Sequence, residues 1–373
     1  MSIVMNLVIE IPEAMENVAN VLTPVLKGYN YVPATNEFSL YPFEMESGGF
    51  CQSFPMVRSG MTTKKCLRLW VNDAARERNL SHIKEVSDYF NRNKPDFVIK
   101  YEYVERAFRL KDGTVLPGVV MDWIEGDRLI NYVRKNYRNS SSMRRLAKSF
   151  RDMVDYLNRN NMAHGDLSGD NIMVTPQGNL VLIDYDSFYV KGQPTNIQQP
   201  TGGVAAFQHP GRGNNRYLNT YMDFFSQQVI YLSLLAIAEK PVLFNPDSDK
   251  ALVFQDIDLA SEQALVKSAA YLGISAIQNT ELKNRLEDLR KDIALPFDQV
   301  RSLTAIYDEQ DRRRKEERPM PLTDVKVYPA KEEVKRTVTS FAPFCGYCGY
   351  RFPIARDNAY YCPMCGTKRA IIR

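Results

Sequence analysis

The stretch "HGDLSGDN" at residues 164–171 holds an acid, Asp166, and an amide, Asn171, five positions later in a segment rich in turn residues. Phosphoryl transfer requires metal ligands that bridge the phosphates and a carboxylate that orients the attacking hydroxyl group. Mg²⁺ prefers oxygen ligands of this kind. A lone pair with this spacing is more often a surface turn. The surrounding sequence therefore decides between a phosphate site and a turn.

The sequence after this stretch supplies a second carboxylate. Residues 172–186, "IMVTPQGNLVLIDYD", contain two short apolar runs around a Pro-Gln-Gly-Asn turn, a pattern that predicts a β-hairpin. The hairpin would return Asp184 to the side of Asn171. The segment before it carries Leu146, Phe150 and Leu157 on one helical face. The loop and the hairpin together predict a site with Asp166 as base and with Asn171 and Asp184 as Mg²⁺ ligands.

Composition predicts a soluble globular protein with more than one unit. The chain has 373 residues, of which 44% are hydrophobic and 25% are charged. Its net charge of +4 is too small to argue for a nucleic-acid-binding protein. The longest apolar run, Val229–Ala238, falls short of the roughly 18 residues that span a bilayer. With no secretory signal visible, we expect a cytoplasmic protein with no membrane partner.

The order of patterns predicts four regions. Residues 1–35 form an N-terminal helical extension, with a helix at Pro12–Lys27, and residues 308–342 form a charged linker. Between them, short alternating runs predict three antiparallel strands within 37–71, a surface helix at 73–92 and two strands at 97–105 and 118–123. Residues 126–306 read mostly as helices, apart from the hairpin and a loop rich in Gly, Pro and Gln that follows it to about Asn219. Residues 343–373 form a separate small module.

Several motifs in order make residues 36–306 resemble the protein kinase superfamily. "HGDLSGDNIMV" looks like the catalytic loop, "LIDYDS" like the metal-binding DFG segment, and "VVMDWIEGDRL" like the fifth strand and hinge. The resemblance implies an α+β, two-lobed fold with a β-rich N-lobe and a helical C-lobe, and ATP with Mg²⁺ as cofactors. It makes Met121 the gatekeeper position and places the backbone of Asp122, Trp123 and Ile124 against the adenine. Asp223 would brace the catalytic loop, with His164 as a further support, and Phe207–Pro210 would close the activation segment.

The third strand and the glycine loop depart from the kinase pattern. In "CLRLW", Cys66 stands for the usual Ala and Arg68 for the Lys that contacts the α- and β-phosphates. Strand alternation places Cys66, Arg68 and Trp70 on one face and Lys65, Leu67 and Leu69 on the other, so Lys65 does not replace the missing Lys. Arg68 retains the charge, but its planar fork is not equivalent to an ammonium group. "ESGGF" offers Gly48 and Gly49 for nucleotide contact, although a simple hairpin turn would use the same glycines.

Other departures concern the acidic partner of Arg68 and the loops. Glu85 is the preferred partner from spacing, Glu77 is the second choice, and a solvated role is open for both. Gly165 replaces the Arg that reads an activation-loop phosphate in many kinases, so phosphorylation of that loop is a weaker expectation. Asp186 replaces the DFG Gly and is expected to face solvent rather than a metal. Ser168 replaces a Lys that many Ser/Thr kinases place near the γ-phosphate.

The loop alone leaves three lineages open. "HGDLS" followed by Asn171 also looks like the loop of RIO-type atypical kinases, and H-G-D-x-x-x-x-N like that of small-molecule phosphotransferases. The hinge, the Asp223 helix and the Phe207–Pro210 closure favour a eukaryotic-like Ser/Thr protein kinase. A pseudokinase scaffold that binds nucleotide or a protein partner without transferring phosphate is the alternative, because of Arg68.

The C-terminal module carries four cysteines in two C-x2-C pairs, Cys345 with Cys348 and Cys362 with Cys365. This spacing predicts a structural Zn²⁺ site with four thiolate ligands and no open position, as in a zinc ribbon. Its Arg, Lys and Tyr residues favour docking of a protein substrate or partner over docking onto the kinase-like domain, with nucleic acid the least favoured ligand. The whole arrangement resembles prokaryotic kinases with zinc ribbons, some of which are encoded with a phosphatase and a von Willebrand A-type protein.

Overall fold

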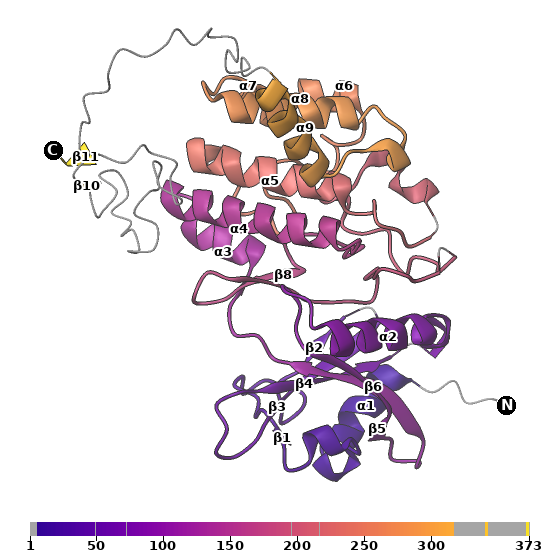
Figure 1. Ribbon diagram of the computed structural model, residues 1–373. Coiled ribbons are helices and arrows are strands. Elements are labelled where there is room, and N and C mark those ends of the chain that lie inside the picture. The colour runs from indigo at the N-terminus through magenta and orange to yellow at the C-terminus, as the bar shows by residue number, and fades with distance from the viewer. Residues whose placement is uncertain are drawn as a thin grey trace, which may run out of the picture. The chain divides into compact units, whose positions relative to one another are not determined.

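The computed structural model describes residues 6–48, 50–71, 73–194, 196–215 and 217–316, together with 340–341 and 371–372. The chain divides into two compact units, Met1–Arg314 and Lys315–Arg373. Within the first unit, a sheet with two helices is followed along the chain by a largely helical part (Figure 1). This mixed architecture agrees with the predicted two-lobed α+β fold.

The first lobe is built on an antiparallel sheet in the order β1-β3-β4-β6-β5, with β2 also paired to β3. Its strands are β1 (Asn30–Tyr31), β2 (Glu46–Ser47), β3 (Cys51–Val57), β4 (Lys65–Trp70), β5 (Tyr101–Arg109) and β6 (Val115–Asp122). The predicted strand at 97–105 is therefore displaced toward the C-terminus, and a turn at residues 111–114 joins β5 to β6. In β4, residues Leu67 and Leu69 pack into one core cluster and Trp70 into the other. This confirms the alternation expected for "CLRLW".

Two helices cover opposite faces of this sheet (Figure 1). Helix α2 (Asp73–Asn93) packs on the face that continues into the helical lobe, through Ile83, Val86 and Phe90. Helix α1 (Leu7–Met15) packs on the other face against Leu67 and Leu69. The described part of the predicted N-terminal extension thus contributes to the core of the first lobe.

The predicted helix at Pro12–Lys27 is wrong in both bounds. Helix α1 ends at Met15, and the 3₁₀ turns η1 (Val18–Asn20) and η2 (Pro24–Leu26) follow it. Between them Val21 forms a bridge to Phe108 of β5, so pairing with the sheet overrides the helical periodicity.

Pro12 lies inside α1 and ties it to the sheet. Because proline has no N–H group, the carbonyl of Val8 lacks its usual intrahelical donor. The side chain of Gln52 on β3 donates to that carbonyl at 2.9 Å. A helix with an internal proline is therefore stable here because a strand supplies the missing hydrogen bond.

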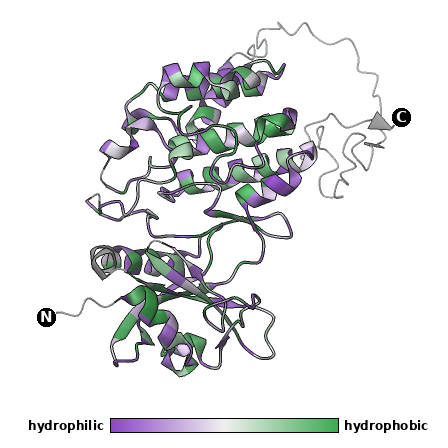
Figure 2. Cartoon of the chain, turned by 180° about the vertical axis from the view of Figure 1, so that it is seen from behind, coloured by the Kyte–Doolittle hydropathy of each residue, from purple (hydrophilic) through white to green (hydrophobic). Residues whose placement is uncertain are grey.

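The second lobe is helical and begins after a short hinge. Its helices are α3 (Leu129–Asn136), α4 (Ser140–Arg159), α5 (Phe224–Glu239), α6 (Glu262–Lys267), α7 (Ala269–Ser275), α8 (Thr280–Asp292) and α9 (Leu303–Glu316). Helix α4 is amphipathic, as its sequence predicts, and packs on α5, which is buried along most of its length. Hydrophobic residues dominate α5, whereas surface helices mix both kinds (Figure 2). None of the described helices is long and apolar enough to cross a membrane.

A small sheet lies at the start of the second lobe and carries the candidate site. It has the order β7-β8-β9, formed by β7 (Asp127–Arg128), β8 (Ile172–Val174) and β9 (Leu180–Leu182). Strands β8 and β9 are the predicted hairpin, which is confirmed. Short 3₁₀ turns follow at η3 (Ala205–Phe207), η4 (Pro210–Asn214), η5 (Pro241–Leu243) and η6 (Phe297–Gln299).

The second unit is described only at two paired strands. Strand β10 (Ser340–Phe341) pairs antiparallel with β11 (Ile371–Ile372). The four predicted zinc ligands, Cys345, Cys348, Cys362 and Cys365, lie outside the described residues, so the zinc ribbon stays a prediction. Helix α9 continues to Glu316, past the predicted start of the linker at residue 308.

Candidate phosphoryl-transfer site

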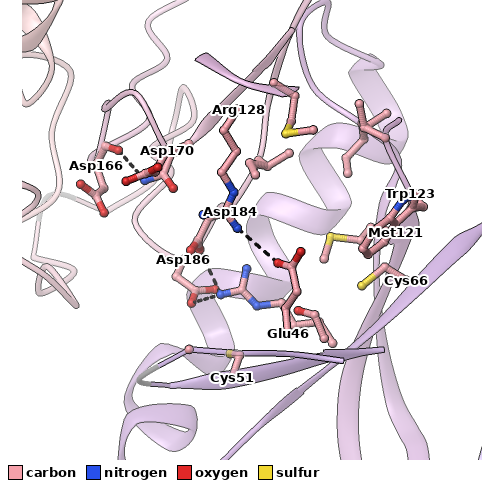
Figure 3. A pocket seen from close by; sticks show the side chains of 18 of the residues that line it. Glu46, Cys51, Cys66, Met121, Trp123, Arg128, Asp166, Asp170, Asp184 and Asp186 are labelled. Carbon is pink, nitrogen blue, oxygen red and sulfur yellow. Dashed lines mark hydrogen bonds and ion pairs between the residues drawn. The ribbon is translucent and has the colours of Figure 1, made fainter. Parts of the chain in front are cut away.

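A cavity of about 600 Å³ is bounded by β2–β4, the hinge and the β8–β9 sheet. The predicted site residues that line it are Gly48, Arg68, Met121, Asp122, Trp123, Ile124, Asp166, Asn171 and Asp184. Gly49 lies outside the described residues. In Figure 3, Asp166 and Asp170 lie on one side of the cavity, Asp184 and Asp186 lie together near its centre, and Met121 and Trp123 lie on the far side. Residues far apart in the sequence thus surround one space.

The loop that carries Asp166 is held by buried hydrogen bonds. The carboxylate of Asp223, at the start of α5, accepts the backbone N–H groups of His164 and of Gly165, the latter at 2.9 Å. His164 Nε2 lies 2.7 Å from the Ile183 carbonyl, while its Nδ1 accepts the Asp166 N–H at 3.3 Å. Because a carbonyl only accepts, these partners assign a neutral imidazole protonated at Nε2. The predicted supporting roles of His164 and Asp223 are confirmed.

Asn171 is oriented by the same loop. Its side-chain Nδ2 donates to the Asp166 carbonyl at 2.7 Å, which leaves the Oδ1 oxygen free to face a cation. The Ile183 N–H donates to the Asn171 carbonyl at 3.0 Å, so the hairpin brings Asp184 to Asn171 as expected. A carboxylate and an amide oxygen at this place are suitable ligands for Mg²⁺.

Asp184 adopts a backbone conformation that L-residues rarely take. Its φ is 65°, in the left-handed region, where a non-glycine residue is strained. Strain of this kind costs roughly 1–3 kcal/mol and is concentrated at functional sites. The Asp184 side chain is 46% exposed, so the strained residue presents its carboxylate to the cavity.

One guanidinium binds two carboxylates in the cavity. Arg68 Nη2 lies 3.0 Å from Asp184 Oδ1 and 2.7 Å from Asp186 Oδ2. The side chains of Arg68 and Asp186 are only 9% and 15% exposed. The prediction that Asp186 faces solvent is therefore wrong, because Arg68 draws it into the cleft.

The three charges shift each other's proton affinity. Burial alone would raise the pKa of Asp184, but the charge and hydrogen bond of Arg68 outweigh it and leave the pKa lowered. Burial raises the pKa of Asp186 to about 6; Arg68 opposes this shift and the neighbouring Asp184 charge adds to it. Asp184 is thus the more acidic and the more accessible carboxylate of the pair.

Contacts of Tyr185 and Gly165 hold the segment 184–187 in place. Tyr185 is buried, accepts the Ile99 N–H at 2.9 Å and donates to the Leu182 carbonyl. Its ring packs edge-on against Phe90 of α2, with centroids 5.0 Å apart. Gly165 has φ 80°, and a Cβ there would lie 2.2 Å from the Ser187 carbonyl oxygen. Gly165 therefore permits the catalytic loop to touch the segment that carries Asp184.

Two lysines, one just before β4 and one at its start, hold the hinge by ion pairs. Lys65 pairs with Asp122, and Lys64 pairs with Glu125 at 2.9 Å. The Trp123 N–H donates to the Lys64 carbonyl at 3.2 Å, so this N–H is not available to a ligand. Among the described residues, no partner is recorded for the Ile124 N–H. The hinge can therefore offer Ile124 rather than Trp123 as a backbone donor.

The glycine segment forms the tip of a hairpin at the mouth of the cavity. The Gly48 N–H donates to the Cys51 carbonyl at 2.8 Å, which closes a tight turn between β2 and β3. Gly48 both lines the cavity and makes the turn, so the two interpretations of this glycine are compatible. Glu46 of β2 pairs with Arg128 of β7 at 3.2 Å and spans the opening (Figure 3).

Arg212 is a buried arginine that holds the catalytic loop, and sequence reasoning missed it. It lies after the predicted closure, is 3% exposed and donates to the carbonyls of Gly165 and Met222. The Val204 N–H donates to Asp166 Oδ1 at 3.2 Å, so the same segment also contacts the predicted base. The catalytic loop is thus anchored by an arginine that follows the predicted activation segment.

The preferred acidic partner on α2, Glu85, is corrected. Glu85 Oε2 accepts from Gln193 Nε2 at 3.3 Å, and the carboxylates recorded against Arg68 are Asp184 and Asp186. The side chain of Glu77 lies outside the described part of the chain. Within the described part, no group of three His, Cys, Asp or Glu side chains could hold a metal ion alone. A cation at Asn171 and Asp184 would therefore need water or phosphate oxygens as further ligands.

The two-lobed fold and this cleft define a kinase-like protein. A family model for the RIO domain matches residues 116–197, from β6 to the loop after β9. Curated relatives include a probable serine/threonine-protein kinase PknB of Bifidobacterium longum, 24% identical over 188 residues, which cover 49% of this chain and 26% of the relative. The kinase max-2 of Caenorhabditis elegans is 24% identical over 160 residues, 43% of this chain and 23% of the relative. CBL-interacting serine/threonine-protein kinase 8 of Arabidopsis thaliana is 23% identical over 208 residues, 55% of this chain and 44% of the relative.

These similarities support membership of the protein kinase superfamily. The chain spans about a quarter of the length of the first two relatives and less than half of the third. The matching family model belongs to the RIO lineage, which the sequence interpretation ranked below eukaryotic-like Ser/Thr kinases, whereas the three relatives are named as Ser/Thr kinases. The superfamily is therefore supported, and the activity and lineage are matters of proposal.

Proposed function

We propose that the protein is an ATP- and Mg²⁺-dependent kinase that phosphorylates Ser or Thr side chains of a protein. The observation that carries this proposal is the convergence of Asp166, Asn171, Asp184 and Arg68 on one cavity next to a hinge. The names of the similar proteins support Ser/Thr specificity.

Each residue has a role that its contacts support. Asp166, half-buried beside the activation segment, would orient and deprotonate the substrate hydroxyl. Asn171 Oδ1 and the exposed Asp184 carboxylate would hold Mg²⁺, which would neutralise charge on the phosphates. Arg68 would contact the nonreacting phosphates, and the hinge backbone near Ile124 would bind the adenine.

The C-terminal module would serve docking. We propose that Cys345, Cys348, Cys362 and Cys365 bind one Zn²⁺ and that the resulting ribbon binds a protein substrate or partner in the cytoplasm. A phosphatase and a von Willebrand A-type protein are candidate partners, by analogy with prokaryotic kinases of this arrangement. Nucleic acid is the less favoured ligand.

A phosphate-incorporation assay tests the enzyme proposal. Wild type, Asp166→Ala and Asp184→Ala would be incubated with Mg²⁺ and γ-labelled ATP, alone and with a generic acceptor protein. We expect incorporation by wild type and a loss of at least about a hundredfold in both variants, because each removes a group that acts in the transition state. Equal incorporation in all three would refute the proposal.

One contact favours a second candidate, a pseudokinase scaffold. Arg68 is bound directly to Asp184, the predicted Mg²⁺ ligand, and the two groups would have to separate for metal binding. A scaffold would bind ATP with or without Mg²⁺ and show no incorporation in the same assay. An increase of ATP affinity on addition of Mg²⁺, lost in Asp184→Ala, would favour the kinase.

A further inference from the structure

We propose that Asp186 is the positioning residue that holds Arg68 in the nucleotide cleft, in place of Glu85 of helix α2. The inference rests on the proposed function and deepens it. It assigns a role to the residue that stands where kinases have the DFG glycine.

The contacts of Arg68 show that it is bound more closely to Asp186 than to Asp184. Asp186 Oδ2 lies 2.7 Å from Arg68 Nη2, closer than Asp184 Oδ1 at 3.0 Å. Asp186 is 15% exposed and Asp184 46% exposed, so the inner carboxylate is shielded from water and the outer one is not. A charge-assisted hydrogen bond is stronger where water is excluded.

The charge balance gives the two carboxylates different tasks. One guanidinium cannot neutralise two carboxylates, so the cluster has a surplus negative charge directed toward the cavity. When Asp184 turns to a cation, Asp186 still compensates Arg68, and the buried guanidinium is not left unpaired, which would be costly. Arg68 Nε is itself buried without a hydrogen-bond partner among the described residues, so the contacts with the two carboxylates are made by Nη2.

Two described side chains of helix α2, His82 and Glu85, are committed to other contacts. Glu85 Oε2 accepts from Gln193 Nε2, and His82 Nδ1 lies 3.0 Å from the same Gln193 nitrogen. Both α2 side chains thus face the loop after the 184–187 segment. Arg68 is held by β4 and by residue 186, and its position does not require a particular placement of Glu85.

Binding measurements with matched variants test this assignment. The affinities for ATP and for adenosine would be measured by calorimetry, with Mg²⁺, for wild type, Asp186→Asn, Asp186→Glu and Arg68→Ala. The double variant Arg68→Ala with Asp186→Asn completes a thermodynamic cycle, and Glu85→Gln is the control on α2. Adenosine reports the adenine and ribose contacts without the phosphates.

We expect Asp186→Asn to weaken ATP about tenfold, as the loss of one charged hydrogen bond implies, and to leave adenosine unchanged. Asp186→Glu should restore part of the ATP affinity, Glu85→Gln should bind like wild type, and Asp186→Asn should have no further effect when Arg68 is absent. Unchanged ATP affinity in Asp186→Asn, or an equal loss for adenosine, would overturn the inference.

A second readout separates this inference from the proposed function. If wild type binds no ATP, the proposed function fails. Urea unfolding of the wild type, the two single variants of the cycle and the double variant then decides the positioning role. Coupling between Arg68 and Asp186 in the unfolding free energy supports the pair, and strict additivity overturns it. Normal ATP binding that depends on Arg68 but not on Asp186 would overturn the inference alone.

Discussion

Replacement of Gly165 by alanine would test whether the catalytic loop needs direct backbone contact with the segment that carries Asp184. Gly165 has φ 80°, and an added Cβ would lie 2.2 Å from the Ser187 carbonyl oxygen and 2.7 Å from the Ser187 Cβ. Gly178, at the β8–β9 turn, has φ 85° with nothing within 4 Å of an added Cβ. The two variants share the conformational strain and differ in the steric clash.

The expected magnitudes follow from these two terms. An alanine in the left-handed region costs roughly 1–2 kcal/mol, so Gly178→Ala should lower the free energy of unfolding by about that amount. A clash in a packed site adds roughly 1–3 kcal/mol, which gives about 2–5 kcal/mol for Gly165→Ala. Urea unfolding of both variants would measure the difference.

The functional result should separate the variants further. To accommodate the methyl group, the loop must move away from Ser187, which changes the distance between Asp166 and Asp184. Phosphate incorporation should therefore fall in Gly165→Ala and stay near wild type in Gly178→Ala. Equal losses of stability in the two variants would show that the close approach at Ser187 is not tight and would refute the reasoning.

Three further perturbations follow from buried charges and from the cysteine module. Burial lowers the pKa of His82 to about 4, so its neutral form contributes stability that is complete above about pH 6.5 and is lost as pH falls toward 4. His82→Gln should remove roughly 3 kcal/mol of this pH dependence in urea unfolding compared at about pH 7 and about pH 4, and parallel curves would contradict it. Arg285 is 3% exposed and, in the described structure, has no hydrogen-bonded guanidinium nitrogen, although Asp288 lies 3.0 Å away. Because Asp288 also pairs with a second arginine, Arg285→Met should leave the unfolding free energy unchanged or raise it by up to about 4 kcal/mol, and a loss above about 2 kcal/mol would contradict this expectation. Elemental analysis should find about one zinc per chain, and its persistence after replacement of Cys345 and Cys348 by Ser would contradict the zinc ribbon.

Local patterns predicted much of the site because its parts are regular elements. The alternation in β4 placed Arg68 on the correct face, and the turn at 176–179 predicted the hairpin that returns Asp184 to Asn171. The bracing of the loop by Asp223 followed from a motif of known arrangement and is seen in its two N–H contacts.

The partners of Arg68 could not be predicted because they depend on convergence in space. Spacing on α2 suggested Glu85, but the distance from β4 to residue 186 is set by how the hairpin packs below the sheet. Arg212 illustrates the same limit, since nothing in "HPGR" signals that its guanidinium reaches the Gly165 carbonyl. Helix α1 was misplaced because the hydrogen bond that permits Pro12 comes from a strand forty residues later.

The contact between α1 and the sheet bears on how the protein should be prepared. A shortened chain that starts at residue 36, where the kinase-like pattern begins, would lack Leu7, Ile11 and Met15, all buried against Leu67 and Leu69. The bared sheet would present an apolar surface and would favour self-association. Biochemical work on the cleft should therefore keep helix α1, which lines the back of the strand that carries Arg68.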